Sequence, residues 1–128
     1  MTALIGAASA LPTPLTVTAL TVGEERVLVW RVAGEIDLVT VERLRNHLSK
    51  HALGAHRGVV LDCTGVSFLA ACGIGLLTEI ADQARAEGVT LRLVAQNRTV
   101  LRALEVTGVE GLLPRVATVA EAVVQCST

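Results

Sequence analysis

Aromatic residues are almost absent from this 128-residue sequence, which has one tryptophan, one phenylalanine and no tyrosine. Because 52% of the residues are still hydrophobic, aliphatic side chains and alanine must fill the core. Positive charge is not in excess either, since 11 basic residues face 12 acidic ones and the net charge is −1. Without a basic face or aromatic stacking residues, the chain is not expected to bind nucleic acid.

Long apolar runs are missing as well. No run approaches the roughly 18 consecutive apolar residues of a membrane span, and residues 1–14 contain no Lys or Arg, which argues against a secretory signal. The cysteines Cys63, Cys72 and Cys126 are odd in number and scattered, so they do not indicate a disulfide framework. We therefore expect a cytoplasmic protein without a membrane segment.

The length fits one domain. Residues 1–14 are small, polar and interrupted by proline, and we interpret them as a mobile N-terminal tail in front of a domain over residues 15–125. The runs 15–22 and 26–34 are rich in β-branched residues, and the Gly23-Glu24-Glu25 segment between them indicates a hairpin. The second run is apolar on both faces, which predicts a central strand.

Helical and strand patterns alternate after this hairpin. Helices are expected to begin after Thr40, Ala70, Asn97 and Thr118. Gly88 and Gly108 are expected to end the second and third of them. The last helix has an apolar side formed by Val119, Val123 and Val124. Strands are expected at 57–63, 90–95 and within 111–115, and a loop at 64–70. The order β-β-α-β-α-β-α-β-α predicts an α/β fold with a mixed β-sheet of about five strands and about four helices.

Three kinds of chemical site are disfavoured. Gly73 and Gly75 could open a dinucleotide fingerprint, but Thr78 occupies the place of the third glycine. A zinc site could use His47 and His51, one helical turn apart, yet no cysteine or carboxylate follows in a ligand pattern, and a solvated helix face is favoured for them and His56. Cys72 as a nucleophile would need a nearby base. We therefore expect neither an enzyme nor a cofactor.

The stretch FLAACGIGLL, Phe68 to Leu77, places very small side chains and a thiol where a helix begins. Small residues let another surface approach the backbone, and the free N–H groups of a helix start favour a negative charge. Two interpretations stay open at this point. The segment either packs tightly under a neighbouring element or forms a docking surface that is sensitive to negative charge.

Three segments together resemble the STAS domain of bacterial anti-sigma factor antagonists. The first is GEID, followed by Thr40 and Leu44. The second is VVLDCTGVSFLAACGIGLL, and the third is the β-α-β tail. The resemblance as a whole covers about residues 15 to 125. The resemblance implies a domain that binds an anti-sigma factor, an ATP-binding serine kinase of histidine-kinase-like fold, and so frees a sigma factor for transcription. In that family the anti-sigma factor phosphorylates a serine at the start of the helix after the third strand, and this ends the binding.

The family pattern runs Phe, an aliphatic residue, Asp, Ser, Ser or Thr, Gly, whereas this chain reads Phe68-Leu69-Ala70-Ala71-Cys72-Gly73. The resemblance thus makes Cys72 the phospho-acceptor equivalent. It also implies that the partner is bound by Asp37, Ala70, Ala71, Cys72, Gly73 and Gly75.

Without a hydroxyl at position 72 the kinase cannot add its phosphate there, so we expect a domain that stays competent for binding, as a monomer or weak dimer. Phosphate on Ser67 or Thr64 instead would contradict this. In the favoured interpretation, Cys72 stands in for serine only because the two side chains are similar in size. In the other, oxidation of Cys72 to a sulfinic acid restores the negative charge that phosphoserine carries in relatives. The alternatives to an antagonist are a non-phosphorylatable STAS scaffold and a ligand- or redox-sensing module in a signalling assembly.

Overall fold

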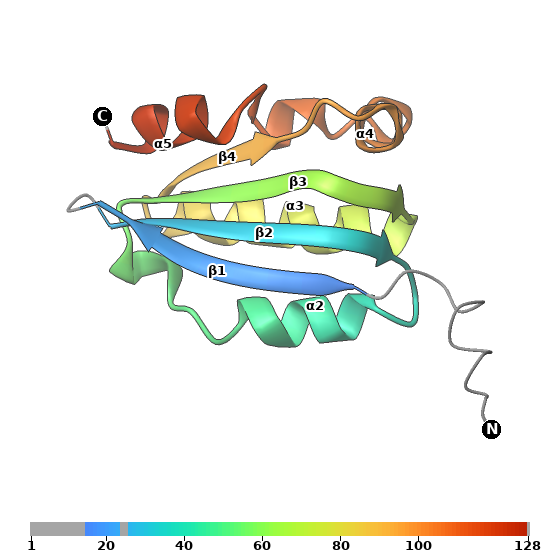
Figure 1. Ribbon diagram of the computed structural model, residues 1–128, viewed down its shortest axis with the longest axis horizontal. Coiled ribbons are helices and arrows are strands. Elements are labelled where there is room, and N and C mark those ends of the chain that lie inside the picture. The colour runs from blue at the N-terminus through green and yellow to red at the C-terminus, as the bar shows by residue number, and fades with distance from the viewer. Residues whose placement is uncertain (1–14, 24–25, 128) are drawn as a thin grey trace.

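The computed structural model describes residues 15–23 and 26–127, so the expected tail at 1–14 lies outside the described residues. Within this part of the chain the strands and α-helices follow the expected order (Figure 1). In chain order they are β1 (Thr16–Val22), β2 (Val27–Ile36), α2 (Val41–Leu48), β3 (Gly58–Leu69), α3 (Ala71–Ala86), β4 (Thr90–Val94), α4 (Arg98–Thr107), β5 (Arg115–Val116) and α5 (Val119–Ser127). Short 3₁₀ turns lie at Leu53–Ala55 and Glu110–Leu112.

The five strands form one mixed sheet in the order β1-β2-β3-β4-β5. β1 runs antiparallel to β2, whereas β3, β4 and β5 each run parallel to the preceding strand. Both the hairpin and the mixed sheet are therefore confirmed. β2 lies between β1 and β3, as its two apolar faces predicted, and its Trp30 side chain is only 1% exposed.

β3 is longer than the sequence predicted, and the expected loop at 64–70 is wrong. The strand continues to Leu69 because two register shifts against β2 each place one extra residue in β3. Arg31 pairs with Asp62 and Ala33 with Gly65, and a Cβ at Gly65 would lie 2.8 Å from the Ala33 Cβ. Turn-forming residues therefore serve here as β-bulges, which bend a strand without ending it.

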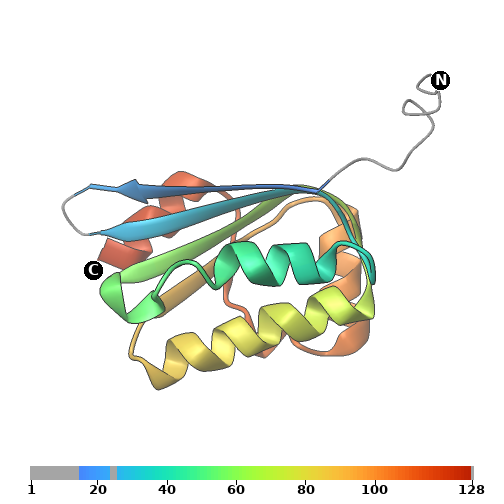
Figure 2. The same cartoon turned by 90° about the horizontal axis from the view of Figure 1, so that it is seen from below.

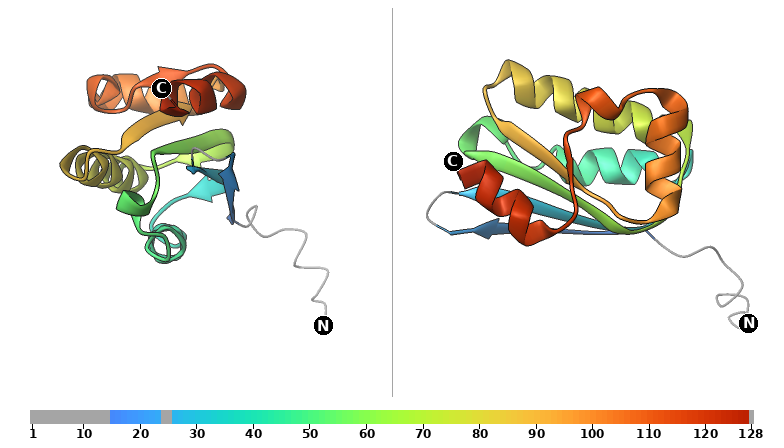
Figure 3. Two further views of the ribbon diagram at one scale, coloured as in Figure 1. Left: turned by 90° about the vertical axis from the view of Figure 1, so that its left-hand side faces the viewer. Right: turned by 90° about the horizontal axis from the view of Figure 1, so that it is seen from above.

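Helices cover the two faces of the sheet unequally. α2 and α3 lie side by side on one face (Figure 2), over a large core that contains Trp30, Leu44 and Leu77. α5 lies across the other face (Figure 3), where a smaller cluster includes Val60 and Cys126. α4 packs near the carboxyl end of β3, close to the start of α3 (Figure 3). This arrangement brings the starts of α3 and α4 to the same end of the sheet.

Helix ends follow the glycine signals but not all of the expected caps. Gly88 and Gly108 have φ of +71° and +72°, the left-handed conformation that ends a helix. Asn97 precedes α4 as predicted, yet its side-chain amide donates to the Val66 carbonyl of β3. The cap of α5 is confirmed, since the Glu121 N–H donates to the Thr118 hydroxyl at 3.2 Å.

The carboxyl-terminal segment differs from the prediction in two ways. The short strand lies at Arg115–Val116, because Glu110–Leu112 forms a 3₁₀ turn. α5 buries Ala122 and Cys126, while Val124 is 63% exposed. Cys126 fits because Gly58 of β3 lies against it: a Cβ at Gly58 would be 2.4 Å from the Cys126 Cβ.

Candidate docking surface

The carboxyl ends of β2 and β3 bring the two predicted contact segments together. Ile36, the last residue of β2, pairs with Leu69, the last residue of β3. The Ala70 N–H then donates to the Ile36 carbonyl at 2.9 Å. As a result, the loop that starts at Asp37 and the helix that starts at Ala71 leave the sheet from adjacent positions. The two segments are therefore neighbours in the structure, although they are 33 or more positions apart in sequence.

The start of α3 has no side-chain cap, because Ala70 occupies the N-cap position. Its backbone is extended, with φ −80° and ψ 166°, and its carbonyl accepts the N–H groups of Gly73 and Ile74 at 2.9 and 3.2 Å. From Phe68 to Thr78 no side chain carries a charge. The amino end of the helix is therefore small and uncharged, and the positive end of its dipole lies there.

The small residues of this segment serve different purposes. Ala71 and Gly75 are exposed, and a Cβ at Gly75 would meet nothing within 4 Å. Gly73 is buried, and a Cβ there would lie 2.6 Å from Ile36 Cγ2. Cys72 is half-buried and packs against the large core. The packing interpretation is confirmed for Gly73. Ala71 and Gly75 are exposed, so for them the docking surface stays a prediction.

Asp37 organises the loop that precedes α2. Its carboxylate accepts hydrogen bonds from the N–H groups of Val39 and Thr40 at 2.9 and 3.0 Å. These bonds, the one from Thr40 first, hold the pKa of Asp37 below its ordinary value of 3.8. Thr40 precedes α2 as expected, and as an N-cap threonine it could have capped the helix, but its side chain does not. Its hydroxyl instead donates to the Glu35 carbonyl at 2.7 Å and accepts the Asp37 N–H at 2.9 Å.

Sequence reasoning missed three apolar side chains at this end of the sheet. Leu38 and Val39 are 81% and 82% exposed, and Phe68 is 48% exposed. Leu38 and Val39 lie in the Asp37 loop, and Phe68 pairs with Glu35 at the ends of β3 and β2. The available signal was two aliphatic residues between Asp37 and Thr40, in a turn where polar residues are usual. Large apolar side chains with this exposure are frequent in protein contact sites. We define the docking surface as residues 37–39, Phe68, residues 70–72 and Gly75.

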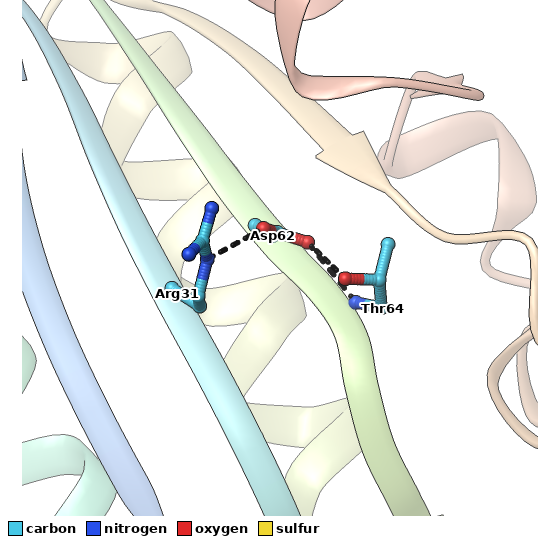
Figure 4. A network of polar contacts seen from close by, with 3 residues as sticks. All are labelled: Arg31, Asp62 and Thr64. Carbon is cyan, nitrogen blue, oxygen red and sulfur yellow. Dashed lines mark hydrogen bonds and ion pairs between the residues drawn. The ribbon is translucent and has the colours of Figure 1, made fainter.

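A polar network fixes the bulge of β3 just before this surface (Figure 4). Asp62 accepts the Thr64 hydroxyl and N–H at 2.8 and 3.1 Å through one oxygen, and Arg31 Nε at 3.1 Å through the other. Asp62 is 2% exposed and is the buried charged residue of the described chain. Its carboxylate therefore replaces the ladder hydrogen bonds that the bulge interrupts. The Thr64 and Ser67 side chains are exposed.

The three cysteines lie in different environments. Cys63 is fully buried in β3, and burial raises its pKa to about 12. Cys126 is also buried, and burial raises its pKa too. Cys72 is half-buried at the start of α3, so it is the most accessible thiol of the described residues. Cys63 therefore acts as a small hydrophobic residue of the core.

The histidines do not form a metal site in the described part of the chain, where no group of three potential metal ligands occurs. His51 contacts the Trp30 ring edge to face, with centroids 6.0 Å apart. His56 hydrogen-bonds the Ala52 carbonyl through Nδ1 at 3.0 Å. Among the described residues, no helix is long and apolar enough to cross a bilayer.

Comparison with known proteins identifies the fold and the family. Residues 18–122 match the STAS domain family. A Mycobacterium tuberculosis protein named as an anti-anti-sigma factor is 32% identical over 106 residues, which cover 81% of this chain and 72% of that protein. The anti-sigma-F factor antagonist RsfA of the same organism is 27% identical over 92 residues, 70% of this chain and 72% of RsfA.

A solved structure has the same arrangement. The crystal structure of an anti-sigma factor antagonist from Mycobacterium paratuberculosis superimposes with a TM-score of 0.78 at 25% identity, over 92% of this chain and all of that one. The mixed five-stranded sheet with four helices agrees with it. On these grounds the chain belongs to the STAS domain family.

Proposed function

We propose that this STAS domain is an anti-sigma factor antagonist that binds an anti-sigma factor through the docking surface and so frees a sigma factor. The relatives named above support the class of function. The observation that carries the proposal is the exposed, uncharged amino end of α3 beside the apolar Asp37 loop. A helix start without bulky or charged side chains lets a partner approach its backbone closely.

Within the proposal, the partner is an ATP-binding serine kinase of histidine-kinase-like fold. A phosphate on this surface would add nearly two negative charges and disrupt contact with an apolar or acidic patch. Cys72 offers no hydroxyl for that transfer. The antagonist therefore stays able to bind while its kinase is active, and Ser67 and Thr64 do not take over as acceptors. Binding rather than catalysis is the activity, and no cofactor is required.

The proposal also sets the roles of the individual residues. Leu38, Val39 and Phe68 supply apolar contact area, and Ala71 and Gly75 allow close approach. Asp37 contributes its ordered loop and its single negative charge. Gly73 acts through packing, because it is buried in this structure. We assign binding to the domain of residues 15–125, so removal of residues 1–14 should leave the affinity unchanged.

Titration calorimetry with the cognate anti-sigma factor tests this function. Wild type and Cys72→Ser should bind with similar affinity, because serine matches cysteine in size. Cys72→Asp should bind at least tenfold more weakly, because it places a negative charge against the partner. Ala86→Asp, which adds the same single negative charge at the exposed far end of α3, serves as the matched control and should bind like wild type. Equal affinities for Cys72→Asp and wild type would remove Cys72 from the docking surface.

Oxidation of Cys72 provides a separate test of the redox alternative. We propose that cysteine replaces serine here by size alone, so it carries no switch. After treatment with hydrogen peroxide, mass spectrometry identifies the protein in which Cys72 has become a sulfinic acid. That species should lose affinity as Cys72→Asp does, but only at peroxide doses that also oxidise an unactivated thiol such as free glutathione. Selective oxidation of Cys72 at micromolar peroxide, with loss of binding, would establish the redox switch instead.

A further inference from the structure

The two edges of the sheet are built differently. The edge strand β5 has only two residues, Arg115 and Val116, and one of them is charged. The other edge strand, β1, has seven residues and forms the border of the sheet (Figure 2). In the described part of the chain, β1 pairs with β2 on one side and with no strand on the other. A long edge of this kind presents backbone N–H and C=O groups that another strand can pair with.

β1 has none of the features that usually protect an edge strand from such pairing. Those features are charged side chains, proline, or a bulge that turns the strand away. The sequence of β1, TVTALTV, contains no charged residue and no proline, and five of its seven residues are exposed. Its register against β2 runs from the pair Thr16–Ala33 to the pair Val22–Val27 without a shift. The edge is therefore long, regular and uncharged.

Leu20 of β1 is a large aliphatic side chain that this structure leaves in solvent. It is 64% exposed, although it pairs with Val29 of β2, which is buried in the smaller cluster under α5. Because paired residues lie on the same face of a sheet, Leu20 lies on the face that α5 covers. It is not one of the residues that pack against that cluster. A further strand beside β1 would cover it.

We propose that this further strand is β1 of a second copy of the chain, which pairs antiparallel about a two-fold axis at Ala19. Ala19 is the middle residue of β1, so this register overlaps all seven residues and places Ala19 opposite its own copy. Around such an axis a charged residue meets the same charge in the other copy, and the absence of charge from β1 removes that repulsion. Leu20 faces Thr18 of the second copy and is a diagonal neighbour of its Leu20, within reach of a long side chain.

The paired arrangement leaves both docking surfaces free. Thr16, at the start of β1, pairs with Ala33 towards the carboxyl end of β2, which is the end where the docking surface lies. Because the two β1 strands run in opposite directions, the two docking surfaces lie at opposite ends of the joined sheet. No residue of β1 belongs to the docking surface, so each copy can hold its own partner. The dimer therefore does not depend on the function proposed above.

Sedimentation equilibrium of the full-length protein measures the association. A ladder of one strand pair is small compared with the interfaces of stable complexes, so we expect a weak dimer that depends on concentration. The weight-average mass should rise from 13.4 kDa, the mass of one chain, towards twice that value over about a hundredfold increase in concentration. The mass of a single chain at every concentration would overturn the proposal.

Charged variants at Ala19 locate the interface. Ala19→Lys and Ala19→Glu each place two like charges opposite one another, so each should weaken the dimer about fivefold or more. An equal mixture of the two variants should recover the dimer, because opposite charges then face each other. Ala86→Lys, which adds the same charge at the exposed end of α3, is the matched control and should dimerise like wild type.

The variants also provide results that would contradict the arrangement. Dimerisation of Ala19→Lys with the affinity of wild type would place the contact on another surface. A mixture of the Lys and Glu variants that stays monomeric would show that Ala19 does not face its own copy. Circular dichroism shows whether each variant is folded. If the Ala19 variants do not fold, Leu20→Lys, at a side chain that is already 64% exposed, should weaken the dimer in the same way.

Discussion

Gly73, in the first turn of α3, lies directly against Ile36, the last residue of β2. A Cβ on Gly73 would be 2.6 Å from Ile36 Cγ2 and 2.7 Å from Leu69 Cδ1. Because Gly73 has no side chain of its own, the helix packs directly against the last residues of β2 and β3. This contact keeps the start of α3 beside the end of β2, where the Asp37 loop begins.

Alanine at the two glycines of α3 should change stability in opposite directions. Gly73→Ala should lower the free energy of unfolding by about 1–3 kcal/mol, because the methyl group overpacks the contact with Ile36. Gly75→Ala should raise it by up to about 1 kcal/mol, because alanine favours the helix and its methyl group meets open space. Urea denaturation measures both. A similar loss of unfolding free energy in the two variants would contradict the close contact between Gly73 and Ile36.

The Asp37 carboxylate should stabilise the fold only above its pKa. Its folded-state pKa lies below the ordinary 3.8, because the Thr40 and Val39 N–H groups donate to it. The stabilisation by the charge is therefore present above pH 3.8 and is lost as the pH falls through the folded pKa. Asp37→Asn keeps an oxygen for the same N–H groups but carries no charge.

The urea midpoint of Asp37→Asn should be below that of wild type at about pH 7 and approach it at about pH 2.5. The difference between the two proteins is the quantity to follow, because other carboxylates titrate equally in both. A difference that is the same at both pH values would show that the loop does not depend on the charge of Asp37.

Removal of the Asp62 carboxylate should cost more than removal of the hydroxyl that binds it. Asp62→Ala leaves the Thr64 N–H without its acceptor inside the bulge, and we expect a loss of about 2–3 kcal/mol. Thr64→Val loses one hydrogen bond, worth about 1 kcal/mol. Thr18→Val, at an exposed threonine of the edge strand β1, is the control and should change stability by less than about 0.5 kcal/mol. Equal effects of the two threonine variants would mean that the network does not support β3.

Alkylation should distinguish the three thiols. In the folded protein at about pH 8, iodoacetamide should modify Cys72 alone, because Cys63 and Cys126 are buried and their pKa values are raised. Mass spectrometry should show one adduct for wild type, none for Cys72→Ser and three after unfolding. Rapid modification of Cys126 in the native protein would show that α5 does not protect it.

The order of elements could be predicted because the hydrophobic period changes clearly along the chain. The alternation in 90–95 predicts only a strand, and the spacing of Leu76, Leu77 and Ile80 predicts only a helix. Glycine marks the helix ends. The extension of β3 could not be predicted, because Thr64 and Gly65 are turn residues by local preference. Their strand conformation depends on Asp62 and on Ala33 of the neighbouring strand, which are tertiary contacts.

Parts of the site were also hidden in the sequence. The string Ala70 to Gly75 indicated a close approach, but only the packing shows that Gly73 faces inward and Gly75 outward. The exposure of Leu38 and Val39 depends on the turn that Asp37 and Thr40 build, which local sequence preferences do not reveal. In α5, Cys126 is inside and Val124 outside because Gly58 leaves space under the cysteine.

The central claim is that the docking surface cannot be closed by a serine kinase because position 72 lacks a hydroxyl. The most direct measurement is the affinity for the cognate anti-sigma factor before and after incubation with it and ATP, together with the intact mass of the antagonist. Wild type should keep its affinity and its mass, whereas Cys72→Ser should gain one phosphate and lose most of its binding. Phosphorylation of the wild-type protein, at Ser67, Thr64 or elsewhere, with loss of binding would contradict the claim.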